Sequence, residues 1–240
     1  MGAYDKLKHH VYECNMELSR HGLVIYTFGN ASGLDRAQGV LAIKPSGVAY
    51  ADLRPQDMVV LDMQGQVVEG HLAPSSDTRT HLLLYRHFPT IGGIVHSHST
   101  YAVAWAQACK AIPVLGTTHA DHTHIDIPCT ELLSDEMIRG DYEEATGRQI
   151  LAAFAELSPE VVEMVLVAGH GPFTWGMTPE KAVYNSVVLE ELSKMAWLTL
   201  QIDPSTPRLP ESLIQKHYQR KHGPDAYYGQ TYGQTGPAKR

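Results

Sequence analysis

The sequence predicts an α/β protein with one domain, in which helices flank a central mixed, mainly antiparallel β-sheet. Short apolar runs bounded by glycine alternate along the chain with longer segments of helical periodicity. The 240 residues are 43% hydrophobic and 19% charged, which is ordinary globular composition and enough for one well-filled core. No linker, low-complexity tract or internal repeat interrupts the interior of the chain.

The first half of the chain is predicted to begin with a helix. Its apolar face recurs at helical spacing, at Leu7, Val11, Cys14 and Leu18. Gly22 supplies the C-terminal stop. Strand-like runs follow over 23–29, 39–47 and 58–70, and the last of them is a hairpin that turns at a Gln–Gly pair. The segment 74–89 begins with good N-cap residues and ends in proline, so it is predicted to be a helix.

The second half continues the alternation of strands and helices. Its predicted elements are a strand over 91–98, a helix over 100–109, a strand leading into a loop over 112–122, a turn or short helix over 134–140, a helix over 143–157, a buried strand over 162–171 and a helix over 178–202. Thr178 and Pro179 suit the N-cap and first positions of that last and longest helix.

Charge and cysteine usage exclude several classes of partner. The net charge is −7, from 19 basic and 26 acidic residues without a dense Lys/Arg run, so we expect neither nucleic-acid nor membrane binding. Cys14, Cys109 and Cys129 are far apart and form no C-x-x-C, which is typical of reduced cytosolic thiols. The N-terminus lacks the apolar core of a signal peptide, and no segment is apolar for long enough to span a bilayer. We therefore expect a cytoplasmic protein.

Three histidines at predicted strand ends suggest a metal site. His96 and His98 follow an apolar run, and in a strand their side chains would point to the same face, about 7 Å apart. His170 stands between two glycines at the end of another apolar strand. Together the three could hold a catalytic metal with one position left open. The alternatives are a pair of partly exposed histidines and a histidine that caps a turn.

Small-residue loops suggest a phosphate pocket. Ser75 and Ser76 precede a helix, whose free N–H groups suit an anion. The loops 29–33 and 44–47 consist mostly of small residues that let backbone amides face a ligand, and Lys44 adds a positive charge. Asp77 also stands at the start of that helix, where the helix dipole favours an aspartate. Alternatively, it could be a fourth metal ligand or an acid/base group.

The segment 117–126 leaves three interpretations open. It places Asp121 among His119, His122 and His124. These residues could form a second metal site, or Asp121 could act as a general acid/base beside the first site. They could also be a polar loop with solvated histidines.

Eight segments, in order, resemble the class II (zinc) aldolase/epimerase family, and in particular its sugar-phosphate epimerases. They are TFGNASGLD, IKPSG, VVEG, PSSDTRTH, GGIVHSHS, GTTHAD, HGPFTWG and KHYQRKHG with AYYGQ. The resemblance runs from about Leu7 to Gln230. It implies the class II aldolase-like fold over residues 1–230, and we expect residues 231–240 to be a disordered tail.

The resemblance also implies the site residues. A divalent metal, normally zinc with manganese as the alternative, would be held by His96, His98 and His170, with Asp77 as a further ligand. The sugar phosphate would contact Gly29, Asn30, Lys44, Ser46, Gly47, Ser75 and Ser76. Asp121 would move a proton on one face of the substrate and Tyr228, from a neighbouring subunit, on the other; His217 would also come from the neighbour. The family's assemblies are cyclic homotetramers with sites at subunit interfaces.

The implied reaction is the interconversion of L-ribulose 5-phosphate and D-xylulose 5-phosphate. C4 of a ketopentose phosphate carries no acidic proton, so inversion requires retro-aldol cleavage of C3–C4, rotation of the aldehyde and re-addition. A divalent metal stabilises the enediolate charge as a Lewis acid. Each stereoisomer's C4 hydroxyl needs a proton acceptor on its own side, hence two acid/base residues. Both L-arabinose and L-ascorbate breakdown use such an enzyme.

Two other functions remain as alternatives. In the family's aldolases, which release their fragments, a glutamate base stands at the position of Asp77, so aspartate there favours epimerisation. The adducin head has the fold without enzyme function, and fold alone does not decide. One departure from the family pattern is that His122, Thr123 and His124 follow the HAD segment, where aromatic residues are usual, which allows a pH-sensitive pocket wall.

Overall fold

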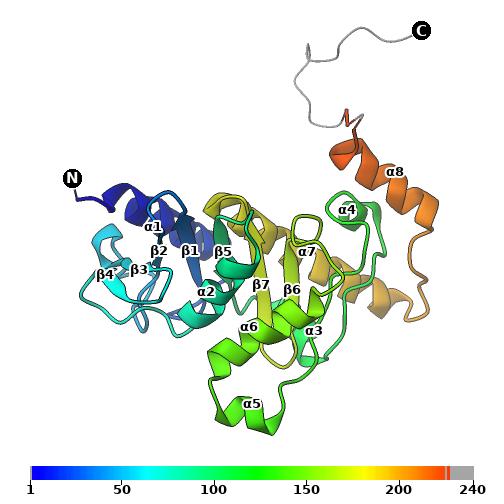
Figure 1. Cartoon of the computed structure of the whole chain (residues 1–240). Coiled ribbons are helices and arrows are strands. Elements are labelled where there is room, and N and C mark those ends of the chain that lie inside the picture. Colours follow the sequence, from blue (N-terminus) through cyan, green and yellow to red (C-terminus); the bar gives the residue numbers. More distant parts are fainter. Residues whose placement is uncertain (1, 225, 228–240) are drawn as a thin grey trace, which may run out of the picture.

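A seven-stranded sheet of order β4-β3-β2-β1-β5-β7-β6 organises the chain in this computed structural model, which describes residues 2–224, 226 and 227 (Figure 1). The strands are β1 Asn30–Asp35, β2 Val40–Ile43, β3 Val59–Asp62, β4 Val67–Glu69, β5 Gly93–His96, β6 Met164–Val167 and β7 Gly171–Gly176. The helices are α1 Asp5–Arg20, η1 Pro55–Asp57, α2 Thr78–His87, α3 Thr100–Gln107, α4 Thr117–Ala120, α5 Asp135–Arg139, α6 Tyr142–Ala153, α7 Pro179–Ile202 and α8 Glu211–His222. All pairings between these strands are antiparallel, and a parallel bridge joins Cys129 to Leu166, so the predicted fold class is confirmed.

Helices cover both faces of the sheet, which explains why its strands are apolar runs and not alternating ones. In β2, Leu41 and Ile43 face the core formed with α2 and α6, which lie across one face (Figure 1). Val40 and Ala42 face the opposite core, to which α1 and α7 contribute. Because side chains alternate along a strand, burying both faces requires every residue of β2 to be apolar.

Most of the predicted elements are confirmed. They are α1, β2, the hairpin of β3 and β4, α2, β5, α3, α5, α6, β6 and α7. The hairpin turns through Gly65, whose φ is 86°. At the start of α7, the Thr178 hydroxyl accepts a hydrogen bond from the Lys181 amide, so the predicted N-cap is also correct.

Several predictions near the site were wrong. Residues 23–29 form turns, with Tyr26 80% exposed at a φ of 52°, and the strand begins only at Asn30. The predicted loop 29–33 is mostly strand β1, because Asn30–Gly33 pair with β5 and Ser32–Asp35 with β2. The Asn15 side chain on α1 bonds both backbone polar groups of Ala31. The predicted strand 112–122 is limited to a bridge at Ile112 and is followed by helix α4.

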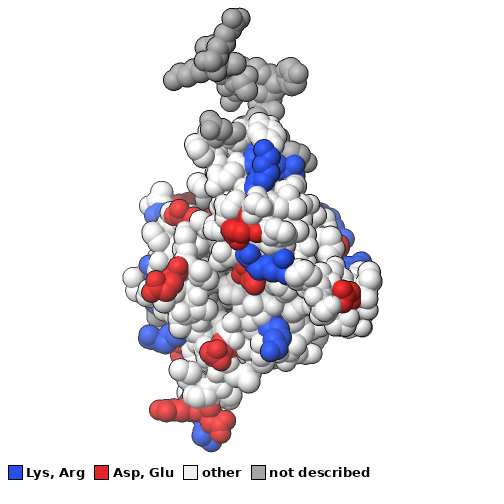
Figure 2. Space-filling view, turned by 90° about the vertical axis from the view of Figure 1, so that its right-hand side faces the viewer, with Lys and Arg blue, Asp and Glu red and all other residues white. Residues whose placement is uncertain are grey.

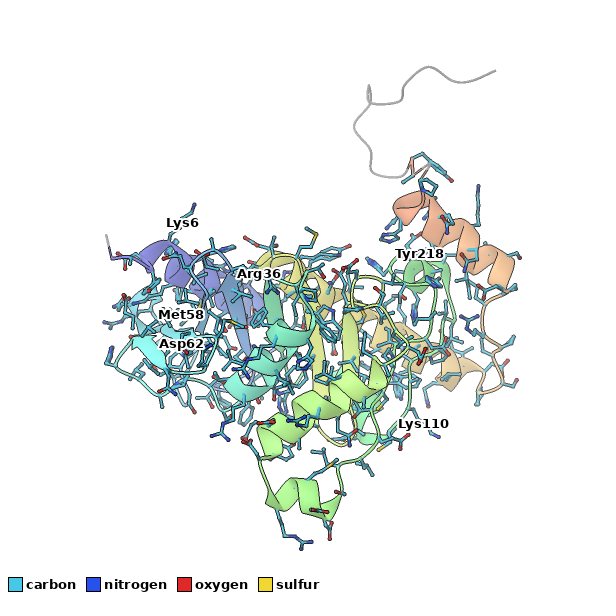
Figure 3. All side chains as sticks on the ribbon, viewed as in Figure 1. Lys6, Arg36, Met58, Asp62, Lys110 and Tyr218 are labelled. Atoms are coloured by element: carbon cyan, nitrogen blue, oxygen red, sulfur yellow. The ribbon has the colours of Figure 1, made fainter. Side chains whose placement is uncertain are left out.

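Strand β7, helix α8 and the short helix η1 were not predicted either. Strand β7 is rich in glycine and contains proline, yet it lies inside the sheet, next to the edge strand β6, and pairs with both β5 and β6. Helix α8 packs beside α4 at one end of the molecule, away from the sheet, where Tyr218 is labelled in Figure 3. Tyr228 and the predicted tail 231–240 lie outside the described residues.

The surface carries mixed charge. On the face shown in Figure 2, acidic and basic side chains are interspersed. Within the described residues, no helix has both the length and the apolar character that a membrane crossing requires.

Candidate active site

A pocket of about 380 Å³ lies where the end of β5 meets the starts of β1, β7 and α2. Its lining comprises Thr27, Phe28, Gly29, Asn30, Lys44, Pro45, Ser46, Gly47, Ser75, Ser76, Asp77, His96, His98, Tyr142, Glu143 and His170. Of the predicted metal and substrate residues it brings together all except His217, and the predicted acid/base residue Asp121 is not among its lining residues.

Three histidine side chains converge in this pocket. Ligand atoms of His96, His98 and His170 all lie within 4.8 Å of one another, and the Nε2 atoms of His96 and His98 are 3.1 Å apart. Tetrahedral zinc, with Zn–N bonds of about 2.0–2.1 Å, places ligand nitrogens about 3.3 Å apart. His98 lies two residues beyond the end of β5, so the prediction that both histidines stand on one strand face is wrong, although their ring centroids are 4.9 Å apart.

The protonation of these histidines suits a cation. His96 Nδ1 lies 2.9 Å from the Pro172 carbonyl oxygen and donates to it, which leaves Nε2 with the free lone pair. Burial lowers the pKa of His170 to about 4 and that of His98 below its usual value, so both rings are neutral at pH 7. Neutral imidazoles are the form that binds metal. The donor set therefore fits a divalent ion.

Asp77 lies beside the histidines in a buried polar cluster. Asn30 Nδ2 donates to Asp77 Oδ2 at 2.7 Å and to Ser75 Oγ at 3.0 Å. Burial raises the pKa of Asp77, but nearby His96, His81 and the Asn30 hydrogen bond outweigh it and hold the pKa below its usual value. The Asp77 carboxylate is not among the ligand atoms within 4.8 Å of one another, and its role as a ligand stays a prediction.

One buried atom of this cluster has no partner among the described residues. Asn30 Oδ1 is enclosed by the protein and accepts no hydrogen bond there. Because an unsatisfied buried carbonyl costs about 1–3 kcal/mol, a bound ligand that donates a hydrogen bond would remove a real penalty. Asn30 therefore supports the identification of the pocket as a binding site for a hydroxylated molecule.

Lys44 is a buried cation at the pocket wall. Its ammonium group donates to three backbone carbonyls, those of Thr27, Pro45 and Val48, at 3.4, 3.3 and 2.7 Å. It also lies 4.9 Å from the centre of the Tyr50 ring. Burial lowers the pKa of Lys44 to about 8. An anion in the pocket would supply the countercharge that the surrounding carbonyls do not.

Two backbone segments form the remaining wall. The Ser75 amide donates to the Lys44 carbonyl at 3.1 Å, which joins the loop after β2 to the segment before α2. Ser46 and Gly47 lie in the first segment, Gly47 with a φ of 70°, and Ser76 follows Ser75 in the second. Hydroxyl and amide donors next to a lysine are the groups that bind phosphate.

A glycine is required at position 29 because the backbone there packs closely against His96. Its φ is +75°, and a Cβ there would lie 2.8 Å from the His96 carbonyl oxygen. We expect Gly29→Ala to lower the free energy of unfolding by about 2–4 kcal/mol, from backbone strain plus this clash, as measured by urea unfolding. Gly39 is the matched control, because its φ is +65° but a methyl group added there would meet nothing within 4 Å. Equal losses of unfolding free energy in Gly29→Ala and Gly39→Ala would contradict a clash at Gly29.

Asp121 and His217 lie together, outside the pocket. Asp121 follows α4, and its Oδ1 is 3.0 Å from His217 Nδ1 on α8 of the same chain. Arg220 forms a bidentate pair with it, at 3.0 and 2.7 Å, and Lys221 Nζ is 3.7 Å away. Burial raises the pKa of Asp121, but Arg220, His217 and Lys221 outweigh it, so the pKa lies below its usual value. One chain therefore does not place Asp121 at the three histidines.

The other histidines of this segment are separate from one another. Among the described residues they form no group of converging metal ligands. His119 is buried and lies 3.2 Å from the Ile125 carbonyl, and burial lowers its pKa to about 4. The rings of His122 and His124 contact Tyr184 and Tyr218. These contacts favour a packed wall over a second metal site.

The predicted site residues leave out five residues of the pocket lining: Thr27, Phe28 and Pro45, which adjoin predicted ones, and Tyr142 and Glu143, which do not. The Tyr142 hydroxyl lies 3.4 Å from His170 Nδ1, and Glu143 lines the same wall. Both lie in the first turn of α6, where the Asp141 side chain accepts from the Glu144 amide. An N-cap at Asp141 could have been predicted from the sequence. No local pattern indicates that this turn reaches His170.

Comparisons with known proteins identify the relatives of this chain. The profile of the family described as Class II Aldolase and Adducin N-terminal domain matches residues 9–197. The chain is 53% identical over 225 residues to the L-ribulose-5-phosphate 4-epimerase UlaF of Salmonella paratyphi C (strain RKS4594), covering 94% of this chain and 99% of the relative. The protein of the same name from Salmonella choleraesuis (strain SC-B67) matches with the same identity and coverage.

Solved structures show the same fold. An L-fuculose 1-phosphate aldolase superposes with a TM-score of 0.76 at 24% identity, covering 92% of this chain and 97% of that one. The L-fuculose-1-phosphate aldolase of Thermus thermophilus superposes with a TM-score of 0.62 at 25% identity, covering 85% of this chain and 99% of that one.

Proposed function

This chain belongs to the class II aldolase and adducin N-terminal domain family, and we propose that within it the protein is an L-ribulose-5-phosphate 4-epimerase. The substrate and product are L-ribulose 5-phosphate and D-xylulose 5-phosphate. The observation that carries this proposal is one pocket in which three converging histidines lie beside Lys44 and two segments rich in hydroxyl groups. A metal site and a phosphate site within one pocket suit a sugar phosphate.

The family is metal-dependent, and the three histidines form the candidate metal site. We infer that the native ion is zinc, because three imidazoles that leave one position open are typical of catalytic zinc, and manganese is the alternative. When bound, the ion supplies Lewis-acid stabilisation of negative charge on the sugar oxygens. In this proposal Asp77 completes the ligand set, and Tyr142, whose hydroxyl lies 3.4 Å from His170 Nδ1, holds the orientation of that ring.

The pocket residues hold the substrate. The phosphate lies against Lys44, Ser46, Ser75 and Ser76 in this proposal, with Gly29 and Gly47 leaving room for it. Asn30 Oδ1, which has no partner among the described residues, accepts a hydrogen bond from a sugar hydroxyl. Held by its phosphate, the two-carbon fragment formed by C3–C4 cleavage turns without escaping, and re-addition to its other face inverts C4.

The proton transfers require residues from a neighbouring subunit. Asp121 accepts the C4 hydroxyl proton on one face, and Tyr228 serves the other. Because Asp121 and His217 are hydrogen-bonded in one chain, they approach a neighbour's pocket together. We therefore expect a homotetramer with sites at subunit interfaces, which sedimentation velocity would test. The three free thiols fit an enzyme of the cytoplasm.

The deciding assay adds L-ribulose 5-phosphate to metal-loaded protein and follows both D-xylulose 5-phosphate and free glycolaldehyde phosphate. Epimer without free aldehyde is the expected result, because the fragment is held while it turns. Accumulation of free aldehyde with little epimer would support an aldolase. No turnover, together with no gain on adding zinc or manganese, would support a non-catalytic binding module.

The buried Lys44 predicts a pH dependence of substrate binding. A lysine is charged below its pKa, here about 8, so the cation that binds phosphate is present at pH 7 and is lost as the pH rises past 8. We expect KM to rise up to about tenfold per pH unit above that value. An ordinary lysine, with a pKa of about 10.4, would hold KM constant to higher pH.

The control for this prediction is Lys44→Gln. This variant should raise KM at pH 7 by about 10–100-fold, because it loses one charge-assisted hydrogen bond to the phosphate. It should also remove the increase of KM above pH 8. The exposed Lys110, labelled in Figure 3, gives the matched variant Lys110→Gln, which should behave as wild type. A wild-type KM that stays constant to about pH 9.5 would contradict the assignment.

A further inference from the structure

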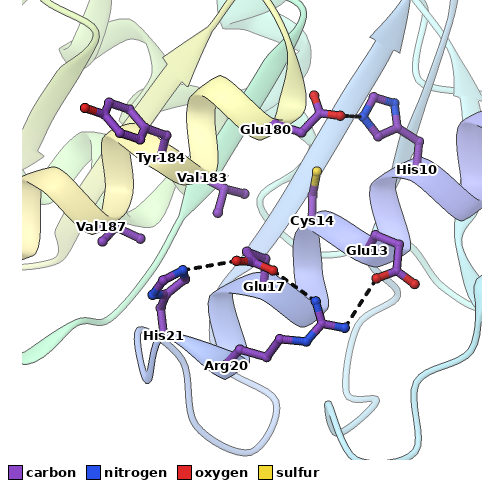
Figure 4. Close-up of a pocket in the computed structure, with 10 residues that line it drawn as sticks. All are labelled: His10, Glu13, Cys14, Glu17, Arg20, His21, Glu180, Val183, Tyr184 and Val187. Atoms are coloured by element: carbon purple, nitrogen blue, oxygen red, sulfur yellow. Dashed lines mark hydrogen bonds and ion pairs between the residues drawn. The ribbon is translucent and has the colours of Figure 1, made fainter. Parts of the chain in front are cut away.

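A second cavity lies between α1 and α7, and none of its lining residues belongs to the active-site pocket. It has a volume of about 390 Å³ (Figure 4). Its lining residues are His10, Glu13, Cys14, Glu17, Arg20, His21, Glu180, Val183, Tyr184 and Val187. None of them was predicted to take part in binding or catalysis.

Three metal-ligating side chains converge in this cavity. One ligand atom each of His10, Cys14 and Glu180 lies within 4.8 Å of the other two. His10 and Cys14 are one turn apart on the same face of α1, and Glu180 stands in the first turn of α7. Figure 4 shows His10 Nε2 bonded to the Glu180 carboxylate, with the Cys14 sulfur directed towards the same space.

The charge around these three groups favours a cation. Glu13 and Glu17 line the same cavity, and the nearby Arg20 is paired with both of them, at 3.3 and 2.9 Å. With Glu180 the cavity contains three carboxylates against one arginine, so these four groups together carry a negative formal charge. A bound dication would reduce this imbalance.

We propose that His10, Cys14 and Glu180 form a second metal site for a divalent ion of the zinc or cobalt class. Sulfur, imidazole and carboxylate ligands together suit these ions and not magnesium or calcium, which take oxygen ligands. On binding, the Cys14 thiol proton leaves to solvent and a sulfur–metal bond forms, and the ion replaces the His10–Glu180 hydrogen bond. The site links α1 to α7 on one face of the sheet.

The other role for Cys14, a reactive thiol, does not fit its surroundings. Its residue is 3% exposed, and burial raises its pKa to about 12, helped by the charges of Glu180, Glu17 and Glu13. A thiol of this kind is protonated at neutral pH and is a poor nucleophile. A metal ion, which stabilises the thiolate directly, is the partner that can use it.

Cobalt absorption tests the proposal independently of activity. Full-length metal-free protein is titrated with Co²⁺, and the near-ultraviolet thiolate-to-cobalt charge-transfer band is recorded together with the bound Co²⁺ per chain. The expected result is the band and a second equivalent of Co²⁺ beyond the active-site ion. Cys14→Ser should lose the band and one equivalent. His98→Asn should keep the band, because the three active-site histidines contribute no thiolate.

Further variants make the outcome decisive. Glu180→Gln and His10→Gln, at less buried positions, should weaken Co²⁺ binding at this site about tenfold or more without the risk of misfolding that a buried substitution carries. His9→Gln is the matched exposed histidine on α1, and Cys109→Ser and Cys129→Ser are the matched thiols; all three should keep the band. Absence of the band in wild type, or its loss in either thiol control, would overturn the proposal.

Discussion

Replacing His98 by asparagine is expected to remove the bound active-site metal and to lower kcat/KM about 10³-fold. His98 Nε2 lies 3.1 Å from His96 Nε2, and asparagine cannot place a ligand nitrogen there. Lewis-acid stabilisation contributes several kcal/mol to a reaction of this kind, and each 1.36 kcal/mol corresponds to a roughly tenfold change in rate. Metal content by plasma mass spectrometry and kcat/KM for L-ribulose 5-phosphate measure the two effects.

His71→Asn is the matched control, because His71 is exposed and does not line the pocket. It should retain both metal and activity. Circular dichroism and the melting temperature show whether His98→Asn remains folded, which we expect because His98 is an exposed side chain on the pocket rim. A folded His98→Asn protein that keeps its active-site metal and full activity would refute the histidine site.

Replacing Asp121 by asparagine is expected to lower kcat by about 10²–10⁴-fold while the metal stays bound. The low pKa of Asp121, set by Arg220, His217 and Lys221 against the effect of burial, keeps the carboxylate ionised at pH 7 and ready to accept a proton. Asparagine has the same shape but no basic oxygen. Because Asp121 lies away from the histidines in one chain, the metal content of the variant should match wild type.

Asp52→Asn, at an exposed aspartate outside the pocket, controls for the charge change and should leave kcat unaltered. Tyr228→Phe should give a loss comparable to that of Asp121→Asn, since the second face of the substrate needs its own proton acceptor. If Asp121→Asn and Tyr228→Phe both kept full epimerase activity, the assignment of these residues as the acid/base pair would be wrong.

Much of the fold could be predicted because local patterns and tertiary packing agree. The helical spacing of α1 and the apolar run of β2 correspond to buried faces in the structure. The three histidines were also correctly expected to converge, since two apolar strands bring His96 and His170 to the same end of the sheet. The small-residue segments around Lys44 and Ser75 likewise line the pocket.

The failures occur where tertiary contacts override local preference. Strand β7 contains glycine and proline, and its pairing with β5 on one side and β6 on the other determines its conformation. The position of Asp121 depends on α8, a helix distant in sequence. Tyr142 reaches His170 only because α6 packs where it does. The pairing of β7 with β5, the contacts of Asp121 with α8 and the contact of Tyr142 with His170 all join residues far apart in the sequence, where no local pattern indicates them.

The position of His96 within the sheet has a consequence for inactivation by heat. His96 pairs with Asn30 on one neighbouring strand and with Phe173 on the other, so this proposed metal ligand lies on the middle one of three hydrogen-bonded strands. Amide hydrogens of such central strands exchange only through the largest unfolding events, whereas edge strands such as β4 open locally. The catalytic centre should therefore be among the last parts of the subunit to melt, and the loss of these ligands on heating should coincide with global denaturation.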